Sequence, residues 1–297
     1  MQRIKYYLQL IKLRLSTTVV FSAIAGYLLG VESYTDIIYL EILFLALGGI
    51  LVVGSANGLN QVLERHHDKL MQRTSGRPLP TRNLLVPEAV IFCLLIGVLG
   101  LAILYQEVNP YCSYYGFASI ILYVFCYTPL KRISPISILV GAVPGAIPFL
   151  LGWVGSHPSS SGFELASGIL FAIQFFWQFP HFIAISWVQD EDYKKAGFKM
   201  MFGGKKGKTS VIISIISSIF LMLASISPYF IDDPRLAMSF FGIIIILTLN
   251  VIFISYSIRL YVEQDDHSAK KLMIFSFIYL PLLQVSFIFD KYYLINF

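Results

Sequence analysis

The sequence predicts an all-helical protein that crosses a membrane about nine times and forms one transmembrane domain over residues 1–297. The first observation is composition: 57% of the residues are apolar and 13% are charged, whereas a soluble domain averages roughly half apolar and a quarter charged residues. The second is spacing, because nine apolar stretches each approach the roughly 20 residues that a helix needs to cross the hydrocarbon core. These observations exclude a soluble globular domain.

The nine predicted spans follow one another with short polar connections. Ahead of the first span, the segment from Tyr6 to Leu15 is predicted to lie on the membrane surface as a helix, with Lys5 and Lys12 extending towards water. The helix of the second span is predicted to continue beyond its apolar part to about Met71. The predicted spans are residues 16–31, 38–62, 88–105, 111–128, 135–155, 164–188, 209–230, 235–257 and 271–289.

The fifth span has the composition of a cavity wall. Small residues run through it together with two prolines, Pro144 and Pro148. Small residues let helices approach closely, and prolines in a membrane helix are tolerated where neighbours or a cavity satisfy the freed backbone groups.

The three cysteines form no C-x-x-C pair, so the sequence predicts neither a disulfide framework nor a thiolate metal site.

Charge predicts the orientation in the membrane. All but two of the 22 Lys and Arg residues fall in loops on one side of the nine-span arrangement, and the exceptions are Arg235 and Lys291. Because basic loops stay in the cytoplasm, we expect a cytoplasmic N-terminus and an external C-terminus, in a bacterial inner membrane. The basic residues are dispersed over separate short loops, so the net charge of +5 indicates a lipid bilayer rather than nucleic acid as the partner.

The end of the second span carries a row of oxygen-bearing side chains. Asn60, Glu64 and Asp68 are four residues apart, so they line one face of a helix. Carboxylate and amide oxygens are the ligands that Mg²⁺ takes in proteins, together with substrate phosphates. The alternative is a charged helix end that faces water, but polar groups this close to the bilayer core are costly and usually functional. The basic residues that follow, which could receive phosphate charge, are Arg73, Arg77 and Arg82.

A second polar cluster follows the sixth span. Its candidate ligands are Gln189, Asp190 and Asp192. Four spans separate it from the first cluster, and an even number of crossings puts both clusters on the same side of the membrane, as a duplicated four-helix unit would. Two facing acidic helix ends predict one shared pocket of the binuclear metal type, and the alternative is a charged loop that anchors a helix end. The spacing leaves open which of the three residues contacts metal.

Other polar residues have more than one interpretation. Lys131 and Arg132, in the loop between spans four and five, are either anchors at the bilayer surface or diphosphate contacts. His181 follows Trp177 inside the sixth span, and it is a haem ligand, a proton donor or a packed residue that hydrogen-bonds a neighbouring helix. His67 either reaches a porphyrin propionate or faces water.

Five motifs support a resemblance to a known family. They are Asn60-Gln-Val-Leu-Glu64-x-x-x-Asp68-x-x-Met71-x-Arg73-Thr74-x-x-Arg77-Pro78-Leu79, Tyr127-Thr-Pro-Leu-Lys131-Arg132, the segment from Gly141 to Trp153, Trp177-Gln-Phe-Pro-His181-Phe, and Asp192-Tyr193-x-x-Ala-Gly197-x-x-Met200. Together they resemble the protoheme IX farnesyltransferase (haem O synthase) family of UbiA-type intramembrane prenyltransferases, over spans two to six. The resemblance implies nine transmembrane helices around a central cavity, capped by loops on the cytoplasmic side.

The resemblance also implies an activity. The enzyme would transfer the farnesyl group of farnesyl diphosphate to a vinyl group of haem b, giving haem O for terminal-oxidase assembly. Haem is then a substrate, Mg²⁺ is the cofactor, and haem A synthase or oxidase-assembly proteins are candidate partners. The implied catalytic and metal residues are Asn60, Glu64, Asp68 and Asp192. The implied diphosphate contacts are Arg73, Arg77, Lys131 and Arg132, and the candidate haem contacts are His181, Trp177 and His67.

The sequence departs from the family pattern in places. Glu64 stands where many members carry Asp, and Ile11-Lys12-Leu13-Arg14 lacks the Thr and Pro that many relatives have there. Val188 and Ala196 lie four residues before and after Asp192, where the wider superfamily pairs two Asp residues.

Two rival functions share some of these sequence features. A UbiA-type enzyme with a quinone or other aromatic acceptor would share the diphosphate motifs, and a secondary transporter would share broken spans but carry its polar residues near the bilayer midplane.

Overall fold

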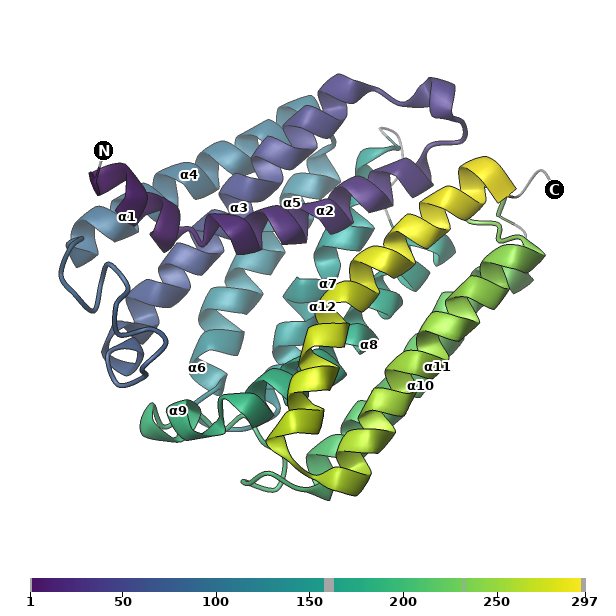
Figure 1. Cartoon of the computed structure of the whole chain (residues 1–297). Helices are drawn as coiled ribbons and strands as arrows, with labels where there is room; N and C mark the ends of the chain where they lie inside the picture. Colours follow the sequence, from purple (N-terminus) through teal and green to yellow (C-terminus); the bar gives the residue numbers. More distant parts are fainter. Residues whose placement is uncertain (1, 158–162, 232, 295–297) are drawn as a thin grey trace.

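The computed structural model describes residues 2–157, 163–231 and 233–294 (Figure 1). Within these ranges the chain is helical, without a strand. The α-helices are α1 (Gln2–Leu10), α2 (Leu13–Gly30), α3 (Tyr39–Asp68), α4 (Val86–Glu107), α5 (Pro110–Ile121), α6 (Thr128–Leu130), α7 (Ser137–Gly155), α8 (Leu165–Val188), α9 (Asp190–Lys195), α10 (Lys208–Ile226), α11 (Phe240–Glu263) and α12 (Asp266–Phe289). Short 3₁₀ or π segments are η1 (Tyr34–Asp36), η2 (Leu122–Tyr127), η3 (Ser227–Phe230) and η4 (Asp290–Leu294).

Eight helices of the described chain are long and apolar enough to cross a membrane, namely α2, α3, α4, α7, α8, α10, α11 and α12. The predicted fourth span, 111–128, is present as α5, η2 and α6, a helical run from Pro110 to Leu130. The predicted all-helical fold of about nine spans is therefore confirmed. The eighth span was predicted as 235–257, but Ser239 accepts a hydrogen bond from the N–H of Gly242 and so caps α11 at a later start, Phe240.

The run from α5 to α6 contains a wide π turn, η2, of a kind that often marks functional sites. Pro129 follows it and has no amide proton to donate. The hydroxyl of Thr128 donates to the carbonyl of Tyr123 at 2.8 Å, which satisfies a backbone group within the wide turn. The segment ends at Lys131, which forms an ion pair with Glu64 and so places this run beside the end of α3.

The predicted surface helix over Tyr6–Leu15 is interrupted. The chain ends α1 and restarts as α2, with Lys12 between them in a left-handed conformation (φ 49°). Gln61 of α3 holds the break, because its Nε2 donates to the carbonyl of the last residue of α1 at 2.6 Å. The prediction that Lys12 extends towards water is wrong, because the break turns its ammonium group towards the buried amides of Asn57 and Asn60.

Helix α7 runs continuously through both of its prolines, and its neighbours satisfy backbone groups beside them. The hydroxyl of Ser119 on α5 donates at 3.4 Å to the carbonyl of Pro144, which Pro148 cannot bond. On another side, the N–H of Phe149 donates to Oε1 of Gln174 on α8 at 3.2 Å. Fifteen of the 19 residues of α7 are buried, with α2, α5 and α8 packed against it, so this helix lies at the centre of the molecule.

Two polar ends close the bundle. The loop 69–85 after α3, the loop 131–136 after α6, and residues 190–207 meet at one end, here called the basic end; the N–H of Lys199 donates to the carbonyl of Lys131 at 2.7 Å. In Figure 1 this end is the lower side, where α6 and α9 are labelled. At the opposite end, Arg235 pairs with Glu164 and with Asp233, each at 2.9 Å.

Candidate active site

The last turns of α3 present a row of buried polar side chains. Asn60, Glu64 and Asp68 are 2%, 5% and 0% exposed, so their four-residue spacing keeps them on one buried helix face. Two carboxylates at this depth need compensating charge, because a buried and unpaired carboxylate is costly. The structure supplies each carboxylate with its own cation.

Lys131, in the loop after α6, forms the ion pair with Glu64. Its ammonium nitrogen also lies 4.8 Å from the ring centre of Tyr127 and 5.1 Å from that of Phe198. Gly141 leaves room for the Tyr127 ring, since a Cβ at that position would lie 2.6 Å from Cδ2. Burial acts to lower the pKa of Lys131, but the charge and hydrogen bond of Glu64, together with Tyr123 and Tyr193, raise the pKa on balance. Lys131 is therefore a fully charged cation held between a carboxylate and two aromatic rings.

Asp68 is paired with Arg77. One guanidinium nitrogen of Arg77 donates to both carboxylate oxygens, at 2.8 and 2.9 Å. The loop after α3 folds back over the helix end, because the hydroxyl of the buried Thr74 donates to the carbonyl of Asp68 at 2.8 Å. This local turn brings the second cation onto the same helix face as the first.

Lys12 joins the row from the break between α1 and α2. Its Nζ donates to Oδ1 of Asn60 at 3.4 Å, and Nδ2 of Asn60 donates to the hydroxyl of Thr128 at 3.0 Å. Burial, together with the nearby Arg77 and Lys131 cations, lowers the pKa of Lys12 to about 7. Three basic side chains therefore converge on the end of α3, and an anion bound among them would reduce their repulsion.

The break between α8 and α9 decides which acid of the second cluster faces the first. Asp192 accepts a hydrogen bond from the backbone N–H of Arg73 at 3.4 Å, so it lies beside the loop after α3. Asp190 pairs instead with Lys194, at 2.6 Å, and Gln189 occupies the break itself. Of the three candidates, the structure thus brings Asp192 to the loop that follows the first cluster.

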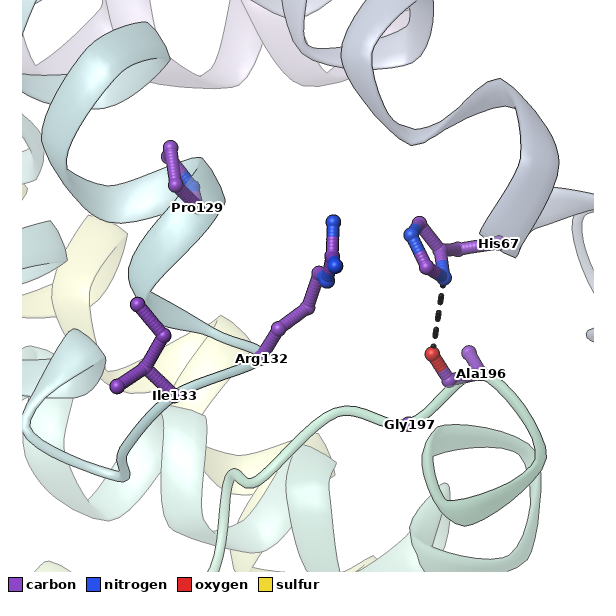
Figure 2. Close-up of a pocket in the computed structure, with 6 residues that line it drawn as sticks. All are labelled: His67, Pro129, Arg132, Ile133, Ala196 and Gly197. Atoms are coloured by element: carbon purple, nitrogen blue, oxygen red, sulfur yellow. Dashed lines mark hydrogen bonds between the residues drawn. The ribbon is translucent and has the colours of Figure 1, made fainter.

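A pocket of about 580 Å³ opens at the basic end beside this row. Figure 2 shows Arg132 reaching from the loop after α6 into the space between Pro129 and His67. His67 Nδ1 is 3.0 Å from the carbonyl oxygen of Ala196, so Nδ1 carries a proton and, in the neutral imidazole, Nε2 is an acceptor. Arg132 is exposed and has no ion pair in the described ranges, which leaves its guanidinium available to an anionic ligand.

The two remaining basic candidates, Arg73 and Arg82, make no side-chain hydrogen bond or ion pair with the buried row on α3 within the described part of the chain. The side chains of Arg73 and Arg82 are exposed, and the contact of Arg73 to the second cluster is made by its backbone. The structure therefore brings the loop of Arg73 to the site. The role of its guanidinium as a diphosphate contact stays a prediction.

His181 and Trp177 lie where α8 meets α12. Nδ1 of His181 is 2.8 Å from the hydroxyl of Ser276, and the imidazole stacks on the Trp177 ring with centroids 4.5 Å apart. Nε1 of Trp177 donates to the carbonyl of Ser276 at 2.9 Å. The packing interpretation of His181 therefore has a definite partner on the neighbouring helix, and its contact with haem stays a prediction.

The candidate metal residues suit Mg²⁺ in chemical type. Asn60, Glu64, Asp68 and Asp192 offer oxygen atoms only, from one amide and three carboxylates. Across the ranges that the structure covers, no three His, Cys, Asp or Glu side chains gather closely enough to hold a metal by themselves. A Mg²⁺ ion that keeps few protein ligands and takes the rest from substrate phosphate fits such a donor set.

Several site residues do not follow from the sequence pattern. The pattern predicts Lys12 at the membrane surface and gives Phe198 and Thr128 no role at the site. The available signal for Lys12 was its place in the short basic motif before the first span, and for the other two their places inside the quoted motifs. The packing of Lys131 between Tyr127 and Phe198 has no signal in the spacing.

The family model described as the UbiA prenyltransferase family matches residues 19–280. A protein named protoheme IX farnesyltransferase from Christiangramia forsetii is 44% identical over 284 residues, which cover 96% of this chain and 92% of the relative. A protein of the same name from Flavobacterium psychrophilum is 43% identical over 285 residues, covering 96% and 93%.

Solved structures share the arrangement of helices. A structure from work on digeranylgeranylglyceryl phosphate synthase has a TM-score of 0.80 at 22% identity and covers 98% of this chain and 99% of that one. A UbiA homologue from Archaeoglobus fulgidus, bound to GPP and Mg²⁺, has a TM-score of 0.66 at 17% identity, covering 95% and 99%. At these identities the likeness concerns the fold alone.

Proposed function

This chain belongs to the UbiA prenyltransferase family, and we infer that it transfers the farnesyl group of farnesyl diphosphate to a vinyl group of protoheme IX, which gives haem O. The observation that carries this function is the identity of 43–44%, over nearly the whole chain, to proteins named protoheme IX farnesyltransferase. The protein is a multi-pass integral membrane prenyltransferase. Residues 1–297 act as a single transmembrane domain.

The diphosphate of the donor binds at the basic end. Arg77, Lys131 and Lys12 converge on the buried face of α3, and Arg132 extends into the adjoining pocket. Arg73, exposed in the loop after α3, is a further diphosphate contact. The two ion pairs hold their cations in place before substrate arrives. Each cation can then turn to a diphosphate oxygen, and charge-assisted contacts of this kind are strongest where the leaving group gains negative charge.

Mg²⁺ is the metal that we propose for this site, held by Asn60, Glu64, Asp68 and Asp192, where it supplies Lewis-acid neutralisation of the leaving diphosphate. The homologue bound to GPP and Mg²⁺ supports this metal for the family. Two of the proposed ligands, Glu64 and Asp68, are buried, and each is paired with a basic side chain.

Cleavage of the allylic C–O bond leaves its electron pair on the diphosphate and a farnesyl cation at the carbon. Tyr127 and Phe198 offer aromatic faces next to the Lys131 ammonium, and Phe182 lies beside Tyr127, with ring centroids 6.2 Å apart. Such faces stabilise a cation while they exclude water. The terminal vinyl carbon of the porphyrin then bonds to the farnesyl carbon. The cation left beside the porphyrin ring takes the oxygen of water, which releases its proton and leaves a hydroxyethylfarnesyl group.

The remaining assignments rest on the charge pattern and on the motifs. We place the basic end and the N-terminus in the cytoplasm and the C-terminus outside a bacterial inner membrane, because nearly all basic residues lie at one end. His181, Trp177 and His67 are the proposed haem contacts. Haem A synthase or oxidase-assembly proteins are the partners that would receive the product.

Mass spectrometry of haem tests the activity directly. Purified protein incubated with haem b, farnesyl diphosphate and Mg²⁺ should convert haem b to haem O, with no product when the metal is chelated. A parallel reaction with a quinone precursor in place of haem tests the rival acceptor class. Prenylation of the quinone precursor together with unchanged haem b would refute the proposed function.

A further inference from the structure

A second pocket, of about 410 Å³, lies at the basic end. It is lined by Ser186 and Asp190, by Lys194 and Lys199, and by a stretch of the loop after α9. The candidate metal site includes Asp192 of α9, whereas this pocket is lined by Asp190 of the same helix. No step of the farnesyl transfer described above assigns it a role.

The polar groups of this pocket favour an anion. Asp190 is already paired with Lys194 at 2.6 Å, and an ammonium group has three donors, so Lys194 keeps donors for a further partner. Lys199 has no ion pair in the parts of the chain that the structure covers. Ser186 is 1% exposed, and its hydroxyl has no hydrogen-bond partner within those parts. A buried hydroxyl without a partner is costly, and a ligand oxygen would satisfy it.

The rest of the lining is apolar. Phe198, Met200 and Met201 are buried and line the pocket together with Pro135. A small inorganic anion would gain nothing from these side chains, whereas a flat ligand with an apolar body and anionic groups would bury its body against them. Porphyrin propionates are such groups on such a body.

The two pockets share one wall. Gly197 lines both of them, and a Cβ at Gly197 would meet no atom within 4 Å, so the space above it is open. Phe198 also lines the second pocket, and its ring centre lies 5.1 Å from the ammonium nitrogen of Lys131, the partner of Glu64. In protoheme IX the two propionates and the two vinyl groups occupy opposite edges of the macrocycle. A porphyrin held by its carboxylates in the second pocket would therefore direct its vinyl edge across this wall towards the diphosphate site.

We propose that the second pocket binds the carboxylates of the porphyrin acceptor, with Lys199, Lys194 and the hydroxyl of Ser186 as their contacts. The inference rests on the proposed function, because it assumes protoheme IX as the acceptor. It assigns the acceptor a site at the basic end that is separate from the diphosphate cations. Lys199 and Ser186 are then specificity-determining residues for the farnesyl transfer.

The test compares haem b with its dimethyl ester, in which both carboxylates are methylated, in the purified full-length enzyme. For the wild type, the ester should have the higher KM. Lys199→Gln should raise the KM for haem b about tenfold, as expected for one lost charge-assisted hydrogen bond, and leave the KM for farnesyl diphosphate and for the ester unchanged. Ser186→Ala should act in the same direction by a smaller factor. Lys205→Gln removes a nearby exposed charge outside the pocket and is the matched control, with unchanged values.

Three results would overturn the proposal. Equal KM values of wild type for haem b and the ester would show that the carboxylates are not bound, although haem O still forms; absence of haem O from wild type would instead refute the proposed function. An equal rise for both porphyrins in Lys199→Gln would show a general effect. Assays in nanodiscs with and without phosphatidylglycerol cover the third result: an effect of Lys199→Gln that needs the anionic lipid, and is the same for both porphyrins, would mean that the pocket binds a lipid headgroup.

Discussion

At the scale of single residues, the site is built on carboxylates that are charged and buried at once. Glu64 and Asp68 are almost completely enclosed, and each has its own cation. Such pairs add little to stability, because desolvation offsets most of their attraction. The ion pairs instead hold the cations in position. A bound diphosphate can then accept hydrogen bonds from these cations, while the carboxylates stay on the same face of α3.

The first prediction concerns these carboxylates. Glu64→Gln and Asp68→Asn each remove a negative oxygen ligand with little change in volume, so each should lower kcat by at least about 100-fold, the usual effect of deleting one group that balances transition-state charge. Turnover is measured at saturating farnesyl diphosphate and Mg²⁺, and gel filtration checks the fold. Glu191→Gln, an exposed neighbour on α9, makes the same charge change outside the site and should keep its activity. Near-wild-type turnover of either site variant would remove that residue from the mechanism.

The second prediction distinguishes what the Glu64–Lys131 ion pair contributes to activity from what it contributes to the stability of the protein. Lys131→Gln should destabilise the protein by about 3 kcal/mol, because the Glu64 carboxylate is then buried without its partner. The double variant Glu64→Gln with Lys131→Gln should recover most of the thermal midpoint in detergent but none of the turnover. Additive losses of stability in the double variant would show that the two side chains are not coupled.

At the scale of helices, the centre of the bundle depends on a close crossing of α2 and α7. A Cβ at Gly152 of α7 would overlap the backbone carbonyl of Ala23 on α2, and a Cβ at Gly26 of α2 would overlap the carbonyl of Phe149. Reciprocal glycines of this kind let two membrane helices pack backbone against backbone. Because α7 also supports α5 and α8, this crossing sets the position of the elements around the site.

The third prediction follows from this crossing. Gly152→Ala should destabilise the protein by about 1–3 kcal/mol, because the backbones must separate to admit the methyl group. Gly168→Ala on α8 is the control, since a Cβ there meets Phe163 at an ordinary 3.7 Å. Thermal unfolding of both variants in the same detergent measures the difference. Equal midpoints for the two variants would contradict the close crossing.

The helices of this protein were predictable from sequence because apolar length alone specifies a membrane span. Their ends were less so. The eighth span starts later than its apolar run because Ser239 caps it, and the surface helix breaks at Lys12 because Gln61, far along the chain, binds the end of α1. Interactions between distant residues decide such boundaries, and a local pattern does not contain them.

The site was predictable where it lies on one helix. The spacing of Asn60, Glu64 and Asp68 predicts a shared face, and these side chains do lie on one buried face of α3. The choice between Asp190 and Asp192 required the break between α8 and α9. The pairing of Glu64 with Lys131 joins segments far apart in sequence, and no spacing rule connects them.

At the scale of the whole molecule, charge and chemistry gather at one end. The loops after α3, α6 and α9 meet there, while the other end is closed by the compact network of Arg235 with Glu164 and Asp233. Basic residues near membrane spans stay on the cytoplasmic side. In the proposed orientation, farnesyl diphosphate would bind with its diphosphate at the basic end, on the cytoplasmic side, and with its farnesyl chain extending into the bilayer.

The last prediction tests this placement with single cysteines. The background carries Cys126→Ser, because Cys126 is exposed while the other two cysteines are buried. Ser75→Cys and Lys205→Cys lie in exposed loops of the basic end, and Thr35→Cys lies in an exposed segment of the opposite end. In intact cells, a membrane-impermeant maleimide should label the cysteine at 35 and should reach those at 75 and 205 only after the cells are opened. Labelling of 75 and 205 from opposite sides would separate the loops that carry Arg77 and Asp192, and one shared diphosphate pocket could not exist. Labelling of both from outside would keep the pocket intact but invert it, so that farnesyl diphosphate would have to be supplied from the external side of the membrane.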